Sequence, residues 1–403
     1  MAAGGEGVAR DSHGRVVFIR GALPGDLVEV AVESERKRFA RASVLRVIEV
    51  GPSRQEPGCR HVLDGCGGCD LQHAQPIAQH ELKRQVVADT LERIGRIPSP
   101  DVRFGGAVAP EGYRTTVRAA VVDGIAGFRA RSSHDVVPAP DCRVAHPTVR
   151  AILAAGRFPG ASEVLVRVGV DSADPITVVT PTATECSVPL GRLVGAGDLT
   201  PGGELGEVFE DLAGHRFRIS ASSFFQSGPA AAELLITTVD AAVGQFASSG
   251  TLADLYSGVG LFAAATDFDG PRMAVEINPS AVADARVNLA NRDIEIVESN
   301  VERWRPRPAD VVIADPARRG LDTAGVATVA ATGARHVVLV SCDPGALGRD
   351  TKLLVEAGYE FGAATVLDLF PSTSHVEAVA VFTRSVAPNP HRPLDRRGPT
   401  SSQ

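Results

Sequence analysis

Hydrophobic and polar residues alternate in three different ways along this chain of 403 residues. The stretches 14–20 and 26–34 are predicted strands, the second with the two-residue period of a half-buried strand, and a turn at Leu23–Asp26 separates them. A third strand pattern follows the basic residues at 36–41. Several strands in so short a segment predict a small β-barrel over residues 1–52.

The next two segments differ in their patterns of predicted helices and strands. Residues 53–215 mix a helix pattern at 76–95 with short strand patterns between frequent Gly and Pro, which predicts a central α+β domain. In residues 216–385, apolar strands alternate regularly with helical stretches. That rhythm predicts an α/β domain with a mostly parallel sheet and helices on both faces. The Pro-, Arg- and Ser-rich tail at 386–403 is expected to be disordered.

Composition narrows the class of protein. Hydrophobic residues make up 44 % of the chain and charged residues 22 %, as in ordinary globular domains. No apolar run is long enough to span a bilayer, and the first residues lack a secretory signal. We therefore expect a soluble cytoplasmic protein that is monomeric and has no membrane partner. The net charge of −7 argues against bulk nucleic-acid binding, but the basic residues at 36–41 could contact phosphate or be a solvated loop tip.

Polar or reactive residues stand at the end of each of five strand patterns in the third segment. Ligands of open α/β sheets gather at the carboxyl ends of the strands, so these residues predict one shared site. In chain order they are Asp254 with the loop Gly258–Gly260, then Glu276, Asn300, Asp315 and Cys342.

The first two of these strand ends favour a nucleotide-like cofactor. The glycine loop allows close backbone approach to a ligand, and Glu276 can accept hydrogen bonds from ribose hydroxyls. Asp254 occupies a position that is usually apolar in dinucleotide folds, which favours S-adenosylmethionine over NAD. An NAD-dependent dehydrogenase remains the alternative on this loop alone.

One single cysteine and one cluster of cysteines suggest catalytic or metal-binding roles. Cys342 precedes a predicted helix with Pro344 near its start, and a helix N-terminus favours the thiolate, although a buried structural cysteine is the ordinary alternative. The cluster of Cys59, Cys66 and Cys69 suits either an iron–sulfur cluster or zinc. His61 and His73 lie close by in the sequence and keep a Cys/His zinc site open, whereas Cys186 has no assigned role.

Several motifs together resemble the uracil carbon-5 RNA methyltransferases of the RumA/TrmA type, and the resemblance covers nearly the whole chain. They are "SFFQ", "DLYSGVGLFA", "DPARRG", "SCDPGALGRD" and "DLFPSTSHVEAV". The first segment resembles a TRAM domain, and the cysteine cluster resembles the iron–sulfur module of the RumA-like branch. The fold implied is a class I Rossmann-like methyltransferase domain behind a TRAM β-barrel and an α+β central domain that carries a metal cluster.

The resemblance also implies a mechanism. Cys342 matches the nucleophile that adds to carbon 6 of uracil, and Glu377 matches the base that removes the hydrogen from carbon 5, with His375 as a rival base. Asp315 matches the residue that holds the polar edge of the uracil. Phe224 could stack on the base or be an ordinary core aromatic. Ser372 and Ser374 depart from the family pattern, which puts the fine geometry of the pocket in doubt.

Cofactors and partners follow from the same resemblance. A [4Fe–4S] cluster is expected on Cys59, Cys66, Cys69 and Cys142, and RNA is the expected partner, with 23S ribosomal RNA favoured over tRNA. A non-catalytic RNA-binding protein on this scaffold is the alternative. Since TRAM-like relatives have a strand before this point, either the start codon lies upstream or the barrel lacks its first strand. The residues expected to bind S-adenosylmethionine are Gln226, Asp254, Tyr256, Gly258, Gly260, Glu276, Asn300 and Asp315.

Overall fold

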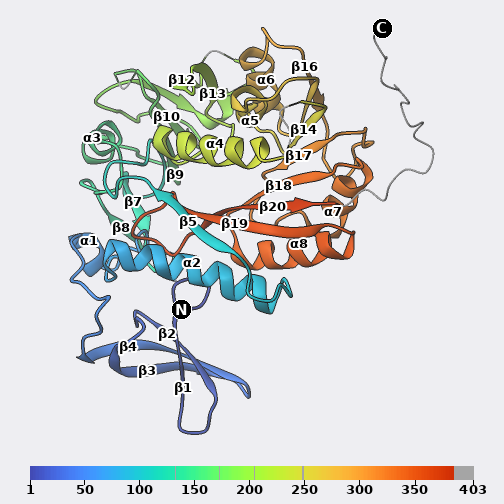
Figure 1. The fold of residues 1–403 in the computed structure, drawn as a ribbon. Helices are drawn as coiled ribbons and strands as arrows, with labels where there is room; N and C mark the ends of the chain where they lie inside the picture. The colour runs from blue at the N-terminus through green and yellow to red at the C-terminus, as the bar shows by residue number, and fades with distance from the viewer. Residues whose placement is uncertain (132, 172, 204, 247–248, 385–403) are drawn as a thin grey trace, which may run out of the picture.

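The structure is a computed structural model that describes residues 1–384 apart from 132, 172, 204, 247 and 248. The expected disordered tail at 386–403 therefore lies outside the described residues. The described strands form sheets of four, six and eight strands and one two-stranded hairpin. Figure 1 shows the four-stranded sheet as a small lobe beneath a larger body. None of the described helices is both long enough and apolar enough to cross a membrane.

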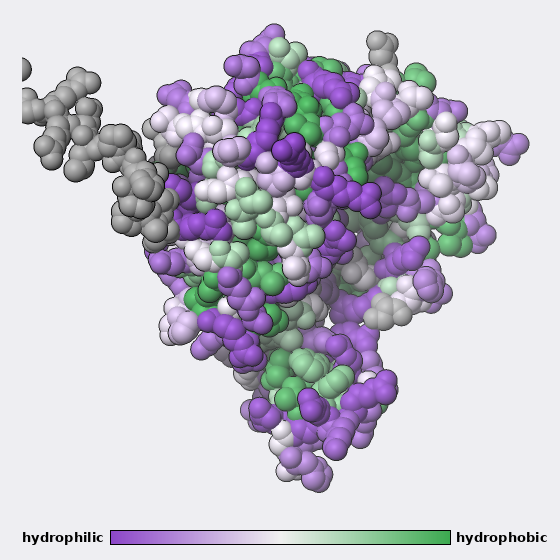
Figure 2. Space-filling model, turned by 90° about the vertical axis from the view of Figure 1, so that its right-hand side faces the viewer, coloured by the Kyte–Doolittle hydropathy of each residue, from purple (hydrophilic) through white to green (hydrophobic). Residues whose placement is uncertain are grey.

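The N-terminal lobe, residues 1–52, contains the strands predicted there. Its core consists of Val17, Ile19, Ala22, Ala40 and Ala42, with neighbouring valines packed against them. The basic residues at 36–38 lie in the exposed turn between the third and fourth strands. Figure 2 shows an apolar patch bordered by polar side chains on this lobe. The strands run in the spatial order β1-β2-β4-β3 and are β1 (Gly7–Arg10), β2 (Val16–Arg20), β3 (Leu27–Glu35) and β4 (Phe39–Glu49).

The central part is a mixed sheet with a helix, as the sequence predicts. Helix α3 (Pro147–Ala155) buries Val149 and Ile152 in a core shared with strand residues such as Val164. A short helix, α1 (Arg60–Leu63), lies within the cysteine segment. The sheet order is β11-β10-β9-β6-β7-β8, and the strands are β6 (Thr116–Val122), β7 (Ile125–Arg129), β8 (Val136–Pro138), β9 (Glu163–Arg167), β10 (Ile176–Thr180) and β11 (Arg192–Gly195), with the short 3₁₀ helix η1 (Ala196–Asp198) after them.

The eight-stranded sheet positions the candidate site. Its first five strands are parallel, and chain order reverses between β14 and β17, where α/β sheets bind their ligands. Its spatial order is β16-β15-β14-β17-β18-β20-β19-β5, with β14 (Leu252–Leu255), β15 (Arg272–Glu276), β16 (Ile294–Glu298), β17 (Val311–Ala314), β18 (His336–Ser341), β19 (Glu360–Asp368) and β20 (Glu377–Thr383). Only β20 runs antiparallel to its two neighbours.

Helices cover both faces of this sheet (Figure 1). Their apolar residues belong to two separate cores, one on each face, which explains why the strands are apolar throughout. On one face lie α4 (Pro229–Gly244), α5 (Leu261–Ala265) and α6 (Pro279–Asn288). On the other lie α7 (Asp322–Ala331) and α8 (Pro344–Glu356).

The predicted segment boundaries do not coincide with the boundaries of the sheets. Strand β5 (Val102–Ala107) pairs in parallel with β19 at the edge of the eight-stranded sheet. Helix α2 (Pro76–Arg93) packs against α8 and buries Val87 and Leu91 in the core beneath that sheet. The boundary at 215 also cuts a hairpin, because β12 (Glu207–Leu212) pairs with β13 (His215–Ser220). Segments assigned to the central domain therefore complete the α/β domain.

Candidate active site

The predicted strand-end residues meet at one rim of the eight-stranded sheet, formed by the carboxyl ends of its parallel strands. Asp254, Glu276 and Asp315 stand at the ends of β14, β15 and β17, and Cys342 follows β18. Asn300 stands two residues beyond β16. The rim therefore brings together every group that the strand pattern singled out.

The glycine loop after β14 is held by Glu276. Gly258 and Gly260 have positive φ angles of 55° and 86°, which only glycine adopts readily, and Gly260 starts α5. The Glu276 carboxylate accepts from the amides of Gly258 (2.9 Å), Ile277 (2.8 Å) and Asn278 (2.7 Å). Since a carboxylate accepts about four hydrogen bonds, one position remains for a ligand hydroxyl.

Asp254 supports this loop from beneath. It is fully buried, and its Oδ2 accepts from the amide of Ala263 (2.9 Å) in the first turn of α5. Its Oδ1 has no hydrogen-bond partner within the described part of the chain. Burial raises the pKa of Asp254 to about 8, against the Ala263 hydrogen bond, and nearby Asp315 and Glu276 add to the rise. Asp254 thus supports the glycine loop, and its direct contact with the cofactor stays a prediction.

Two hollows lie on either side of Tyr256. One, of about 180 Å³, is lined by Glu276, Ile277 and Asn300 among others. The other, of about 50 Å³, is lined by Phe224, Gln226, Gly258 and Asp315. Tyr256 lines both hollows, so they adjoin across its side chain.

Unpaired polar atoms around these hollows fit an adenosine-containing cofactor. The buried Oδ1 of Asn300 and Oγ of Ser257 have no hydrogen-bond partner among the residues described. Buried polar atoms are normally paired, so these two are ready to bond with the amino and hydroxyl groups of a ligand. Together with the free position on Glu276, they fit S-adenosylmethionine.

Cys342 and Glu377 lie side by side on neighbouring strands. Ser341 pairs with Ala378 in the antiparallel ladder, so the next residues along the rim, Cys342 and Glu377, face each other. Glu377 is only 4 % exposed. Burial, and then the charge of Asp315, raises its pKa well above the usual value, and burial raises the pKa of Asp315 to about 7. A thiol and two acids with perturbed pKa values thus form one cluster, as catalytic sites do.

The protonation of Cys342 differs from the sequence expectation. The residue does precede α8, but Asp343 is the N-cap of that helix and accepts from the amide of Ala346 (2.7 Å). Burial, followed by the charges of Glu377 and Asp315, raises the pKa of the Cys342 thiol to about 12, with Arg318 opposing. Burial, aided by the two neighbouring acids, therefore outweighs the helix N-terminus and favours the thiol form of Cys342.

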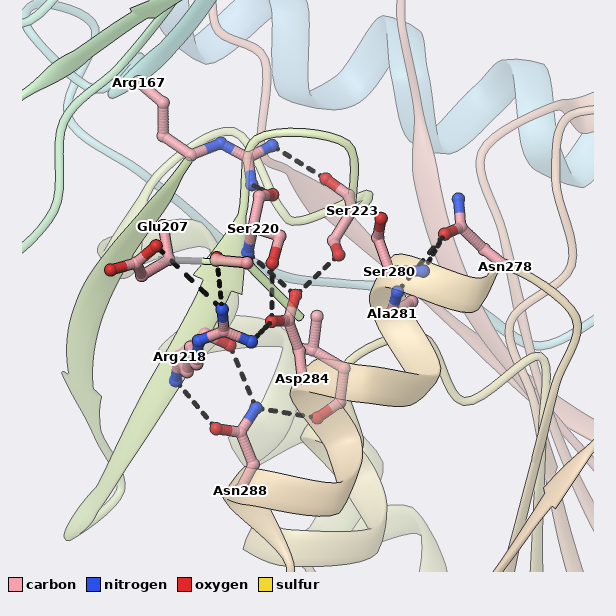
Figure 3. Close-up of polar contacts among 12 residues, drawn as sticks. Arg167, Glu207, Arg218, Ser220, Ser223, Asn278, Ser280, Ala281, Asp284 and Asn288 are labelled. Carbon is pink, nitrogen blue, oxygen red and sulfur yellow. Dashed lines mark hydrogen bonds and ion pairs between the residues drawn. The ribbon is translucent and has the colours of Figure 1, made fainter. Parts of the chain in front are cut away.

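The loop that carries Phe224 and Gln226 is fixed by a buried ionic network (Figure 3). Fully buried Asp284 of α6 accepts from Arg218 Nη1 (2.9 Å), from the Ser220 amide (2.7 Å) and from Ser223 Oγ (2.6 Å). This network leaves Phe224 71 % exposed at the smaller hollow while Gln226 is buried. An exposed aromatic ring at a pocket edge suits base stacking better than a role in the core.

Arg167 holds the same loop from the central sheet. Its guanidinium donates to the carbonyl oxygens of Ser220 (2.6 Å) and Ser223 (2.9 Å). Arg167 and Asp284 were missed by the sequence reasoning because each looks like an ordinary strand or helix residue. Only the convergence of β9, β13 and α6 in space reveals them.

His375, the rival base, shares the neighbouring Arg318 with Cys342 but is not among the groups that shift the pKa of that thiol. Its side chain is exposed and packs edge-on against Phe370, with ring centroids 5.7 Å apart. The groups that shift the pKa of Cys342 are Glu377, Asp315 and Arg318. The geometry favours Glu377 as the base.

Four cysteines line one cavity of about 100 Å³ in the central part. They are free thiols, and burial raises the pKa of Cys66, Cys142 and, to about 12, Cys69. His61 also lines the cavity, but its Nε2 contacts Asp141. Among the described residues, no three His, Cys, Asp or Glu side chains are arranged to hold a metal ion. The four residues that line the cavity are Cys59, Cys66, Cys69 and Cys142.

Comparison with known proteins agrees with this geometry. Residues 3–45 match the TRAM domain family. An uncharacterized RNA methyltransferase of Streptomyces coelicolor is 35 % identical over 95 % of this chain and 91 % of its own length. The 23S rRNA (uracil(1939)-C(5))-methyltransferase RlmD of Halomonas elongata is 33 % identical over 95 % of this chain and 88 % of its own.

A solved structure shares the fold. The tRNA (uracil-54, C5)-methyltransferase of Pyrococcus abyssi, in complex with S-adenosyl-L-homocysteine, superimposes with a TM-score of 0.70 at 22 % identity. The match covers 94 % of this chain and 99 % of that one.

Proposed function

The chain belongs to the uracil-C5 RNA methyltransferase family, and from this premise we propose that it transfers the methyl group of S-adenosylmethionine to carbon 5 of a uridine in RNA through a covalent adduct with Cys342. The observation that carries the proposal is the pairing of β18 with β20, which sets Cys342 opposite Glu377 beside Asp315. A nucleophile and a base are the two groups that this reaction requires.

The residues act in a fixed order. S-adenosylmethionine, when bound, supplies an electrophilic methyl group and a positive charge that offsets the two acids. Cys342 loses its thiol proton to solvent and, as the thiolate, forms a bond to carbon 6 of the uracil, so that the electron pair of the 5,6 double bond makes carbon 5 nucleophilic. Carbon 5 then takes the methyl group. Glu377 removes the hydrogen from carbon 5 as a proton, and the electron pair released expels the sulfur of Cys342 and restores the double bond.

Two further residues orient the base. Asp315 has a pKa raised to about 7, so near neutral pH its carboxyl can accept a hydrogen bond from the uracil N3–H or donate one to a carbonyl oxygen. Phe224 is exposed at the same hollow and offers its ring for stacking. The uridine must leave its stack to reach this rim, which implies an extruded or single-stranded nucleotide.

A trapping experiment tests the nucleophile. RNA that contains 5-fluorouridine has fluorine in place of the hydrogen that Glu377 removes, so the adduct cannot resolve. We expect a covalent protein–RNA complex with the wild-type protein and with Cys186→Ala, a matched removal of a thiol outside the site. Cys342→Ala should give none, and an adduct in this variant would refute the mechanism.

The proposed substrate is 23S ribosomal RNA. Support comes from the named relative that modifies 23S rRNA, which is 33 % identical to this chain, and from the TRAM domain at residues 3–45. Nucleoside mapping of RNA from a strain that lacks the gene tests this choice. Loss of 5-methyluridine from tRNA in place of 23S rRNA would favour the tRNA alternative, and unchanged RNA would favour a non-catalytic binding protein.

The four cysteines at the central cavity are proposed to hold a [4Fe–4S] cluster. The chemistry of the donor set supports this, since four thiols line one cavity and a cluster distributes its thiolates over separate iron atoms. A single zinc ion needs four ligands within about 2.3 Å of one point. Iron and acid-labile sulfide, measured after anaerobic purification of wild type and Cys66→Ser, test the proposal. Stoichiometric zinc without iron would refute it.

A further inference from the structure

The loop that leads to the proposed base contains a strained residue. We call residues 369–376, between β19 and β20, the base loop, because Glu377 follows it directly. Within it, Ser372 has a φ angle of 69°, a left-handed conformation that residues other than glycine rarely adopt. Such a conformation persists only where the surrounding structure holds it, and it is common at functional sites. The contacts that hold this loop therefore bear on the candidate site.

Two distant parts of the chain hold Ser372. Its amide donates to Oε1 of the buried Gln79 of α2 (2.7 Å), and its carbonyl oxygen accepts from the amide of Leu71 (2.9 Å). The Nε2 of Gln79 in turn donates to the carbonyl oxygens of Leu71 (3.2 Å) and Ala74 (2.8 Å). Both backbone polar groups of the strained residue are thus bonded to residues far away in the sequence. Tertiary contacts, and not local preference, impose this conformation.

A second contact holds the base loop closer to the base. Asp70 accepts from the amide of Ser374 through Oδ1 (2.7 Å) and from the hydroxyl of Ser374 through Oδ2 (2.6 Å). Since both oxygens of one carboxylate are used, the bonds fix the orientation of Ser374 as well as its position. Gly5 of the N-terminal lobe packs over this pair, because a Cβ there would lie 2.9 Å from the Cβ of Ser374. The two serines that depart from the family pattern, Ser372 and Ser374, are thus the residues that these contacts hold.

Glu377 depends on the base loop for its position. It is the first residue of β20, where it pairs with Leu367 of β19. On its other side, the ladder between β20 and β18 ends at Ala378. Glu377 therefore stands just beyond the end of that ladder and shortly after Ser374. The approach of its carboxyl to Cys342 is set by the place to which the base loop brings it.

Asp70 belongs to the segment that carries the clustered cysteines. It follows Cys69 directly, and Gln72 shortly after it lines the cysteine cavity. The Oε1 of Gln72 accepts from the amide of Cys59 (3.1 Å), which closes the segment on itself. The segment therefore borders the cysteine cavity and also bonds to the base loop. It joins the cysteine cavity to the loop that leads to the proposed base.

We propose that Asp70 and Ser374 are positioning residues for Glu377, because their pairing fixes the base loop so that the carboxyl reaches the hydrogen on carbon 5. The two residues act through Glu377 and not on the uracil. The inference rests on the proposed function and deepens it, since it concerns the removal of the proton and not the attack of the thiolate. Displacing a catalytic group by about 1 Å can cost roughly a hundredfold in rate, so loss of the pair should slow this one step.

Separate assays of the two halves of the reaction test the proposal. Trapping by RNA with 5-fluorouridine reports formation of the adduct, which does not need the base, whereas 5-methyluridine formation on ordinary RNA needs both halves. For Asp70→Ala we expect trapping within about twofold of wild type and 5-methyluridine formation at least about tenfold slower. The adduct with ordinary RNA should then accumulate on a denaturing gel. A disrupted fold would slow trapping as well, so equal slowing in both assays would overturn the proposal.

Three further variants sharpen the test. Asp70→Asn keeps an acceptor for the Ser374 amide and gains a donor for its hydroxyl, so it should keep most of the wild-type rate. Ser374→Ala keeps the bond from its own amide, and its rate should lie between those of wild type and Asp70→Ala. Asp64→Ala removes an exposed acid from the same segment and should behave like wild type in both assays.

The outcome is separable from that of the proposed function. If the wild-type protein forms no adduct with 5-fluorouridine RNA, the covalent mechanism fails, and the positioning role fails with it. If the wild-type protein is trapped and Asp70→Ala matches it in both trapping and 5-methyluridine formation, the positioning role alone fails.

Discussion

Two sets of buried acids in this protein have opposite surroundings. Asp315 and Glu377 lie on the strands to either side of β18, which leads to Cys342, and burial raises the pKa of both acids. On β19, the neighbour of β20, Asp368 bonds to fully buried Lys83, and on α6 Asp284 bonds to Arg218. The acids that lack a bonded cation are ready to exchange protons, while those bonded to a cation hold elements together. The contrast shows that burial alone does not mark a catalytic acid.

The largest expected effect comes from removing the proposed base. Glu377→Gln keeps the shape of the side chain but cannot take the proton from carbon 5, so kcat should fall by about 10²- to 10⁴-fold. Because Cys342 is intact, the adduct with ordinary RNA should accumulate and be visible as a slowly migrating band on a denaturing gel. Rapid turnover without accumulation would show that another group, such as His375, is the base.

Breaking a bonded pair should instead affect stability. Lys83→Met leaves the Asp368 carboxylate buried without its cation, and we expect the free energy of unfolding in urea to fall by about 3–5 kcal/mol. Lys83→Met combined with Asp368→Asn removes the stranded charge and should recover much of that loss. If the single variant is as stable as wild type, the pair does not fasten α2 to the sheet.

Asp254 is a buried acid without a bonded cation, so replacing it tests how such an acid affects stability at different pH values. Its pKa is raised to about 8, so the folded state holds a proton that the unfolded chain releases near pH 4, and stability should fall as pH rises from about 4 to 8. Asp254→Asn has no proton to lose and should be more stable than wild type at pH 8, on the order of 5 kcal/mol, with little difference near pH 4. Urea unfolding across this pH range measures it. An equal difference at every pH would contradict the assignment.

Exposed charges should matter least. Replacing Arg36, Lys37 and Arg38 with Gln removes three cations from the turn between β3 and β4. If they contact RNA phosphates, affinity should drop roughly tenfold at low salt, and the slope of log affinity against log salt should shrink by about 2. The kcat at saturating RNA should not change. An unaltered salt slope would identify the turn as a solvated loop tip.

Much of the fold was predictable because it depends on local pattern. The strands of the N-terminal lobe and the alternation of strands and helices after residue 251 appear where the sequence period places them. The placement of β5 and α2 was not predictable, since a short strand and an amphipathic helix carry no sign of which sheet they join. Their apolar residues, such as Val87 and Val102, find their partners only across the chain.

The sequence by itself determined which groups reach the rim, because parallel strands deliver the residues at their carboxyl ends to one edge. Asp254, Glu276, Asp315 and Cys342 follow from that rule. The tertiary structure alone decided the protonation of these residues and the contacts that hold them in place. Lys83 meets Asp368 across 285 positions of sequence, and the burial of Cys342, with the acids beside it, reverses the effect expected of its helix. Electrostatics depends on distance in space and on burial, and neither can be read from neighbours along the chain.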